Sequence, residues 1–304
     1  MLKKNKRISK DEASILSKRT KGEKILFAIV TAIFSVYSIS LLYPLLYLFI
    51  NSFQHPLYEL LNPNPFAFPD DWHFENYIKV FTLSIPGTGA TQIYLWQMFL
   101  YSVYYGFTQV VIPAFTCSCV GYVLSKYEFR GRNLIYMVCV VTMTVPVVGT
   151  GASALKLAHM LGTWNNPILD LVTHFTGYGL NFMIMYAFFK NVSWSYAEAV
   201  FIDGGGHFTA FVKVMLPQAK TAILTICIIS FIAVWNNYER PLIYFPDYLP
   251  LAAGLYMIKG QAARQGNQPF YYAGLVIATV PLIVIYSMCS EIIFKNFSIG
   301  GLKG

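Results

Sequence analysis

Six apolar stretches, each long enough to cross a lipid bilayer as a helix, constrain what this sequence can fold into. A bilayer core is spanned by about 20 apolar residues in helical form. The stretches cover residues 25–51, 96–125, 134–157, 169–189, 219–245 and 273–294. The chain is 56% hydrophobic and 12% charged, whereas a soluble domain carries about 25% charged residues. The sequence therefore predicts an all-α membrane protein with six transmembrane helices.

Positive charges predict the orientation of these helices. Short cytoplasmic connections hold an excess of Lys and Arg, and both the second and the fourth of the five connections are basic. The first connection is acidic, as expected of an external segment, and the last is too weakly charged to inform the orientation. Before the first stretch lie nine basic residues: Lys3, Lys4, Lys6, Arg7, Lys10, Lys18, Arg19, Lys21 and Lys24. Both termini are therefore expected in the cytoplasm, and the net charge of +8 reflects topology rather than nucleic-acid binding.

Prolines and glycines interrupt the predicted helices and the first connection. Turn-forming residues make that connection an ordered external segment with little helix; they include Pro56, Pro63, Pro65 and Pro69. Within the helices the breaks are Pro113, Pro146, Gly149, Gly151, Pro241 and Pro281. Inside a bilayer such breaks are tolerated where other helices or a wet cavity surround them, so they favour a bundle with a cavity, although simple packing kinks explain any single proline equally well.

The connection between the fourth and fifth stretches has its own local pattern. Ser195 and Glu198 have the spacing of a capping box, which predicts that a short helix begins there. Residues 204–206 are all glycine and should end that helix, and a second helix is expected over 208–215, ending near Pro217. The outer side should present Tyr196, Val200 and Phe201. Exposed apolar side chains suggest a docking site for another protein; from the residues alone, a segment lying on lipid is a slightly better explanation.

The same connection resembles the EAA loop of ABC importer permeases, which decides between these two explanations in favour of protein docking. The family pattern runs Glu-Ala-Ala, then Gly, then Ile-x-Leu-Pro, and the matching residues are Glu198-Ala199, Gly204 and Leu216-Pro217. Val200 and Val214 depart from it by small apolar exchanges. Residues 202–204 look like the version found in carbohydrate importers. Weaker matches to MalG-like sugar permeases occur in order at 72–77, 129–132, 235–236 and 300–304.

The resemblance implies a non-catalytic permease subunit in the cell membrane of a prokaryote. Its EAA loop, residues 195–217, would be a coupling helix seated in a cleft of a cytoplasmic ATPase subunit, within a permease domain of residues 25–296 flanked by cytoplasmic segments 1–24 and 297–304. The residues expected to couple are Tyr196, Glu198, Ala199, Val200, Phe201, Asp203, Gly204, Gly205, Leu216 and Pro217.

The resemblance also implies the partners of such a subunit. These are a second, different permease, two ATPases and an external solute-binding protein that delivers a sugar or oligosaccharide. No Gly-x-x-x-x-Gly-Lys-Ser/Thr phosphate-binding loop occurs in the sequence. ATP and magnesium are therefore expected on the ATPase subunits, and neither a cofactor nor a metal is expected on this chain.

A polar and aromatic patch near the end of the fifth stretch is a candidate for substrate contact. It consists of Trp235, Asn236, Asn237, Tyr238 and Glu239. Sugars present apolar C–H faces ringed by hydroxyls, which suits aromatic and amide side chains. For Trp235 and Tyr238 an interfacial aromatic belt is a slightly better explanation, whereas Asn236 and Asn237 are expected to face a cavity or another helix.

Two other classes of protein fit the sequence less well. An ion-coupled secondary transporter normally places acidic residues along a membrane pathway, and no chain of acids crosses a predicted helix here. A membrane enzyme would need a cluster of reactive residues, but His159, His174 and His207 are scattered. The five cysteines lie in apolar stretches and are expected to pack rather than to form disulfides.

Overall fold

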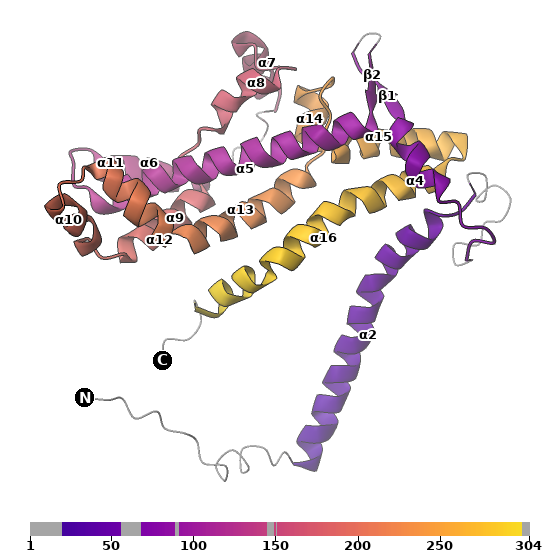
Figure 1. The fold of residues 1–304 in the computed structure, drawn as a ribbon, viewed down its shortest axis with the longest axis horizontal. Coiled ribbons are helices and arrows are strands. Elements are labelled where there is room, and N and C mark those ends of the chain that lie inside the picture. Colours follow the sequence, from indigo (N-terminus) through magenta and orange to yellow (C-terminus); the bar gives the residue numbers. More distant parts are fainter. Residues whose placement is uncertain (1–19, 56–67, 89–90, 145–148, 150, 300–304) are drawn as a thin grey trace.

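The structure, a computed structural model, describes residues 20–55, 68–88, 91–144, 149 and 151–299. It is an elongated bundle of helices with two short strands at one end (Figure 1). Several features of the sequence lie outside the described residues: most of segment 1–24, Pro56, Pro63, Pro65, Pro146 and the glycine-rich ending at 300–304.

Three helices of the described chain are long and apolar enough to cross a membrane, or four if one bent pair counts as a single span. They are α2 (Lys21–Asn51), α5 (Leu95–Lys126) and α16 (Gln268–Ile299). Their positions agree with the first, second and sixth predicted stretches. The bent pair combines residues 207–218 with α13 (Lys220–Trp235) at an angle of 69°.

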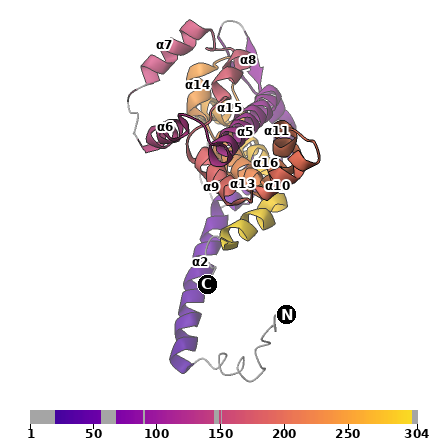
Figure 2. The same cartoon turned by 90° about the vertical axis from the view of Figure 1, so that its left-hand side faces the viewer.

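Helix α2 leaves the rest of the bundle, as the second view shows (Figure 2). It begins with a capping box, in which the Glu23 amide donates to the Thr20 hydroxyl at 3.3 Å and the Thr20 amide to the Glu23 carboxylate at 2.8 Å. Near its other end, Tyr47 contacts Tyr272 of α16 edge-on. Its most apolar stretch has no residue buried within this chain, so lipid or another subunit must cover it.

The third predicted stretch is not one continuous helix. It forms α6 (Arg132–Thr144) and α7 (Gly151–Leu161). Between them Gly149 has a φ of +82°, a left-handed conformation that no residue of an α-helix adopts. The expectation of a single helix over 134–157 was therefore wrong, whereas the break that the sequence predicts at Gly149 is confirmed.

The fourth predicted stretch is likewise broken. It consists of α8 (Pro167–Asp170), the 3₁₀ turn η2 (Leu171–His174) and α9 (Leu180–Asn191). Gly179 precedes α9 with a φ of +87°, and Pro167 starts α8, where its missing N–H is not needed. A continuous helix over 169–189 was also a wrong expectation.

The end of the bundle opposite residues 195–218 carries short elements. The first connection forms α4 (Glu75–Lys79), a 3₁₀ turn η1 (Val80–Thr82) and an antiparallel pair of strands, β1 (Ser84–Pro86) with β2 (Gln92–Tyr94). The last connection forms α14 (Glu239–Tyr244) and α15 (Leu251–Gln265). In the described part of the first connection, the prediction of an ordered segment with little helix is confirmed.

Buried apolar side chains form two clusters, one at each end of the bundle. One joins α5 and α9 to residues 195–219, and the other joins α5, α13, α15 and the strands. At the first cluster α5 and α9 approach closely because Gly121 has no side chain. A Cβ atom at Gly121 would lie 2.9 Å from the Tyr186 amide nitrogen and 3.0 Å from the Met185 Cβ. Small residues allow such approaches between membrane helices, where van der Waals packing drives association.

A larger residue at Gly121 should therefore separate α5 from α9. We expect Gly121→Val to lower the thermal stability of the purified protein, because overpacking costs about 1–3 kcal/mol. Gly22→Val is the control, since nothing lies within 4 Å of a Cβ at Gly22. Equal melting temperatures of the two variants, measured by fluorescence in detergent, would contradict the close approach.

Candidate functional site

Residues 195–218 form a compact helical segment at one end of the bundle, between α9 and α13 (Figure 1). We call it the 195–218 segment. It consists of α10 (Ser195–Ile202), α11 (His207–Ala210), the single π-helical turn η3 (Phe211–Met215) and α12 (Leu216–Gln218). The expected pair of short helices is present, and the chain bends between α12 and α13.

The first helix begins where expected, but without the predicted capping box. Trp194 occupies the N-cap position and Ser195 is already the first helical residue. The Ser195 amide is instead 3.3 Å from the hydroxyl oxygen of Ser193. A capping box needs its serine at the N-cap, and the helix starts one residue too early for Ser195 to act in this way.

Two glycines end α10 in a Schellman motif. The Gly205 amide donates to the Val200 carbonyl at 2.8 Å, and the Gly204 amide donates to the Phe201 carbonyl at 3.1 Å. This pair of hydrogen bonds requires a left-handed residue, and Gly204 has a φ of +80°. At Gly205 a Cβ atom would lie 2.5 Å from Val200 Cγ1. Both glycines are therefore required by the turn, which confirms that the glycines end the helix.

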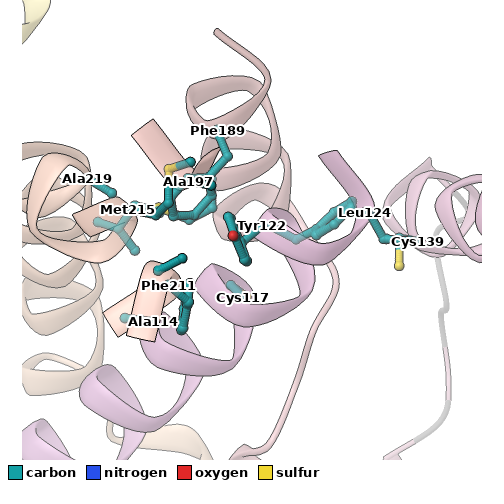
Figure 3. Packing of buried hydrophobic residues seen from close by; sticks show 14 residues of the cluster. Ala114, Cys117, Tyr122, Leu124, Cys139, Phe189, Ala197, Phe211, Met215 and Ala219 are labelled. Carbon is teal, nitrogen blue, oxygen red and sulfur yellow. The ribbon is translucent and has the colours of Figure 1, made fainter. Parts of the chain in front are cut away.

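Aromatic side chains attach the 195–218 segment to the end of α5. Tyr122 of α5 lies between Phe189 of α9 and Phe211 of η3, with ring centroids 5.4 Å and 4.8 Å away (Figure 3). The Tyr127 hydroxyl is 2.9 Å from Nδ1 of His207 at the start of α11. Packed rings of this kind add about 0.5–1.5 kcal/mol per pair beyond the area that they bury. The segment is therefore part of the bundle's core rather than a loose loop.

The exposed apolar side chains of the segment differ from those expected. Tyr196 is 52% exposed, but Val200 and Phe201 are half-buried and pack against the core. The most exposed large side chains are Ile202, at 85%, and Phe208, at 77%, and neither was among the residues expected to couple. A helical repeat that puts residues 197, 200 and 201 inward turns Ile202 outward, so the sequence contained this signal.

The remaining residues expected to couple belong to the same segment as these exposed side chains. The side chains of Glu198 and Asp203 are exposed and form hydrogen bonds with no residue that the structure describes. Ala199 and Pro217 are also exposed, while Leu216 is half-buried. Neither carboxylate therefore holds the shape of the segment through a hydrogen bond to a described residue.

The aromatic and amide patch at 235–239 is divided between core and surface. Trp235 is only 5% exposed, and its indole N–H donates to the Ala278 carbonyl at 3.0 Å. It is therefore a core residue rather than a member of an interfacial belt. Tyr238 stacks on Tyr256 of α15, with centroids 4.8 Å apart and planes 14° apart.

An open hollow lies beside this stack, between α13, α15 and α16. Its lining includes Asn236, Tyr238, Tyr256, Lys259 and Tyr271. The Asn237 carboxamide oxygen instead accepts from the Arg240 amide at 3.3 Å, and Glu239 is exposed. Of the two amides, it is Asn236 that faces an open space.

Within the described residues, no group of three or more His, Cys, Asp or Glu side chains could hold a metal ion. His159 stacks on Trp164, His174 lies beside Asp170, and His207 contacts Tyr127. The three histidines therefore serve three separate local contacts.

The sequence is similar to a family of known proteins. Residues 118–298 match the family described as "Binding-protein-dependent transport system inner membrane component". The chain is 28% identical to the diacetylchitobiose uptake system permease protein NgcG of Streptomyces coelicolor, over 91% of this chain and 89% of that protein. It is 26% identical to the arabinooligosaccharides transport system permease protein AraQ of Bacillus subtilis, over 90% of this chain and 95% of that protein.

A solved structure has a similar fold. It belongs to a bacterial ABC transporter involved in the import of the acidic polysaccharide alginate. The TM-score is 0.75 at 22% sequence identity, and the match covers 90% of this chain and 98% of that chain.

The three adjacent glycines of the segment should respond differently to alanine. Gly204→Ala places a side chain at a positive φ, which costs roughly 1–2 kcal/mol, and Gly205→Ala clashes with Val200. Gly206 has a φ of −90° and no atom within 4 Å of a Cβ, so Gly206→Ala is the matched control. We expect faster hydrogen exchange over 195–218 in the first two variants only; uniform behaviour of all three would contradict the assigned turn.

Proposed function

The chain belongs to the family of binding-protein-dependent transport system inner membrane components, and we propose that it is a permease subunit of an ATP-driven importer for a sugar or oligosaccharide. The family match, which contains the whole 195–218 segment, carries this proposal. The names of NgcG and AraQ, which align along most of the chain, support a carbohydrate as the substrate. We propose that this subunit catalyses no reaction and that ATP and magnesium bind to separate ATPase subunits.

The proposed topology has six crossings with both termini in the cytoplasm. In this topology α6 with α7 provides the third crossing and α8 to α9 the fourth. At 1.5 Å per residue, the 12 residues of α9 span about 18 Å, which is less than a bilayer core of about 30 Å. Short or broken crossings are tolerated where protein surrounds the free backbone groups, and α9 packs along α5. Residues 1–24 and 297–304 would flank the permease domain of residues 25–296.

The 195–218 segment is proposed to dock on an ATPase subunit. Its side chains Tyr196, Ile202 and Phe208 are apolar and exposed, as expected of a docking surface. Glu198 and Asp203 of the same segment have exposed carboxylates available to a partner. A second permease subunit, a second ATPase and an external binding protein would complete the importer.

The mechanism follows from how the segment is attached. Closure of the two ATPases would displace the segment, and its aromatic contacts with Tyr122 and Tyr127 would carry the displacement into α5. The bundle would then switch between inward-facing and outward-facing states as a rigid-body transition. An ion-coupled transporter is the alternative. Against it stands Asp170, the one fully buried carboxylate among the described residues, which is paired with Arg240.

The energy source and the docking surface can be tested together in proteoliposomes containing the complete importer. We expect uptake of diacetylchitobiose, arabino-oligosaccharide or maltodextrin to require ATP inside the vesicle and to be indifferent to proton and sodium gradients. Ile202→Asp puts a charge among the exposed apolar side chains of the segment, so fewer ATPase subunits should co-purify with the permease. Ile78→Asp is the control, because Ile78 is similarly exposed, at 74%, at the other end of the bundle.

Gly204→Asp tests whether displacement of the 195–218 segment drives transport. It should distort the turn at Gly204 while leaving Tyr196, Ile202 and Phe208 in the chain. Uptake and ATPase stimulation are both expected to fall several-fold. If uptake and ATPase stimulation both survive in a normally assembled importer, the segment does not transmit the motion of the ATPases. Uptake driven by an ion gradient without ATP would favour the secondary transporter.

The hollow at Asn236 is the proposed substrate contact of this subunit. A hydrogen bond contributes about 1 kcal/mol, so Asn236→Ala should raise the apparent KM for the sugar about fivefold. Asn237→Ala should change it less, because that side chain accepts from the Arg240 amide at the start of α14 instead of facing the hollow. If both variants keep normal uptake kinetics, the patch from Trp235 to Glu239 is structural.

A further inference from the structure

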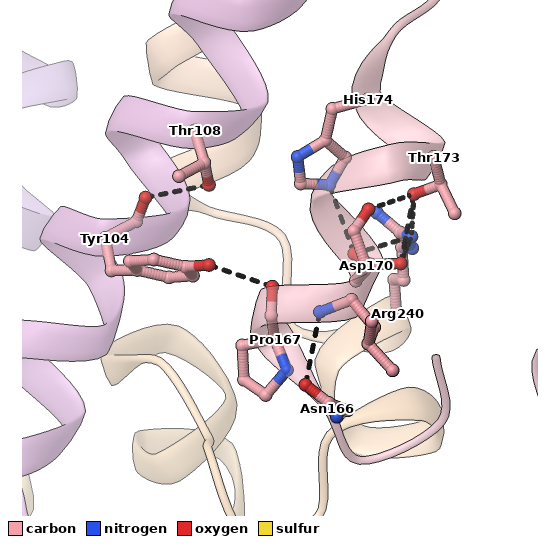
Figure 4. A network of polar contacts seen from close by, with 9 residues as sticks. Tyr104, Thr108, Asn166, Pro167, Asp170, Thr173, His174 and Arg240 are labelled. Atoms are coloured by element: carbon pink, nitrogen blue, oxygen red, sulfur yellow. Dashed lines mark hydrogen bonds and ion pairs between the residues drawn. The ribbon is translucent and has the colours of Figure 1, made fainter. Parts of the chain in front are cut away.

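The part of the chain before α9 and the part after α13 contact each other at a distance from the 195–218 segment. Residues 164–174 come before α9, and residues 239–247 come after α13. They touch each other through a set of polar contacts, which we call the outer clasp (Figure 4). The chain from 164 to 247 therefore forms a closed loop, with the 195–218 segment on one side and the outer clasp on the other.

The centre of the outer clasp is a buried ion pair. Asp170 is 2% exposed, and one guanidinium nitrogen of Arg240 lies 2.9 Å and 3.1 Å from its two carboxylate oxygens. The Thr173 hydroxyl donates to one of these oxygens at 3.0 Å, and His174 Nε2 lies 3.1 Å from the other. Both oxygens of the carboxylate therefore have two partners each.

A second set of hydrogen bonds lies beside the ion pair. The Asn165 amide donates to the Tyr244 carbonyl at 2.7 Å, and the Trp164 indole N–H donates to the Ile243 carbonyl at 3.1 Å. The Asn165 carboxamide donates to Asp247 at 2.6 Å and accepts from the Asp247 amide at 3.2 Å. Asn165 has a φ of +50°, so these contacts hold it in a conformation that few residues adopt.

Asp247 also links the outer clasp to the turn after β1, because its carboxylate accepts from the Thr88 amide and hydroxyl. Burial alone would raise the pKa of Asp247, but the hydrogen bonds from Thr88 and Asn165 outweigh burial and hold the pKa below the ordinary value of 3.8. Its charge, and with it these hydrogen bonds, is therefore present at neutral pH.

Such a contact resists opening more than an apolar contact of the same size. A buried carboxylate is tolerated only while it is paired and hydrogen-bonded. Sliding residues 239–247 past residues 164–174 would leave Asp170 without the Arg240 guanidinium. The contacts of the outer clasp are therefore expected to be either fully formed or fully broken, with few intermediate arrangements.

The two arms of the closed loop each contain a break at which a helix could pivot. Gly179, with its positive φ, precedes α9, and the 69° bend near Ala219 precedes α13. With these breaks alone, a displacement of the 195–218 segment could be absorbed by pivoting. We propose that the outer clasp makes α9 and α13 move as one body, with Asp170 and Arg240 as its positioning residues, so that displacement of the segment reaches the outer end of the bundle. The proposal rests on the proposed function of the 195–218 segment.

The double variant Asp170→Asn/Arg240→Gln, in which both side chains are neutral, distinguishes the outer clasp from a contact that only stabilises the structure. This double variant removes the ion pair without leaving a lone buried charge, so the importer should assemble. A brace needed only for assembly predicts normal transport in that assembled importer. The outer clasp predicts continued ATP hydrolysis with a several-fold lower uptake per ATP. Arg264→Gln is the control, because it removes an exposed positive charge from α15 of the same connection.

The decisive measurement is the separation of the two sides of the clasp during the ATP cycle. Spin labels at Val172→Cys and Ile243→Cys, both exposed positions, are placed in the complete importer after the five native cysteines are replaced by serine. In otherwise unchanged protein, electron–electron double resonance should give the same distance distribution with and without trapped ATP. In the neutral double variant, the two distributions should separate or broaden.

Two results would overturn the outer clasp. One is a distance that changes with nucleotide when Asp170 and Arg240 are intact, and the other is a neutral double variant whose distributions coincide. Should the double variant not assemble, Asn165→Gly takes its place, because glycine accepts the positive φ while losing the hydrogen bonds to Asp247; unchanged distances in that variant would equally overturn it. Failure of the proposed function shows itself separately, as absence of ATP-dependent uptake by the unlabelled wild-type importer.

Discussion

The aromatic contact between α5 and the 195–218 segment is the interaction on which the rest of the structure depends. Helices as short as α10 and α11 have little stability of their own, because helix nucleation is costly and each adds few hydrogen bonds. The segment that contains them is held against the end of α5 by the contacts of Tyr122 with Phe211 and of Tyr127 with His207. Displacement of a segment held in this way should therefore move α5, as the proposed docking role requires.

The bilayer imposes a second constraint, which the broken helices satisfy inside the protein. The backbone between η2 and α9 is not helical, yet the Thr116 hydroxyl donates to the Thr176 carbonyl at 2.7 Å. The Asp170 carboxylate has its partners within the chain as well. In an apolar environment an unpaired polar group costs several kcal/mol. The breaks are thus compatible with a membrane because α5 and α14 supply the missing partners.

Much of the local structure could be predicted from the sequence, and much of the packing could not. The end of α10 before Gly204 follows from the conformational freedom of glycine, whereas its start at Ser195 does not come from the capping box that predicted it. The burial of Trp235 does not, because an indole suits a membrane interface and a helix contact equally well. Likewise, apolar composition indicated a crossing at 134–157 and Gly149 indicated a break in it, but neither could show how α6 and α7 lie relative to each other. Composition reports how much of a segment avoids water, whereas packing depends on which helix lies opposite each face.

The π-helical turn at Phe211–Met215 has a consequence for how this chain tolerates insertions and deletions. A π-turn accommodates one residue more than an α-helical turn, and one residue corresponds to about 100° of rotation around a helix axis. Because the extra residue is taken up within one turn, loss of a single residue there would restore α-helical geometry with little rotation of α11 relative to α13. A one-residue deletion should therefore be tolerated better in this turn than within α13, where it would rotate the flanking residues by about 100°.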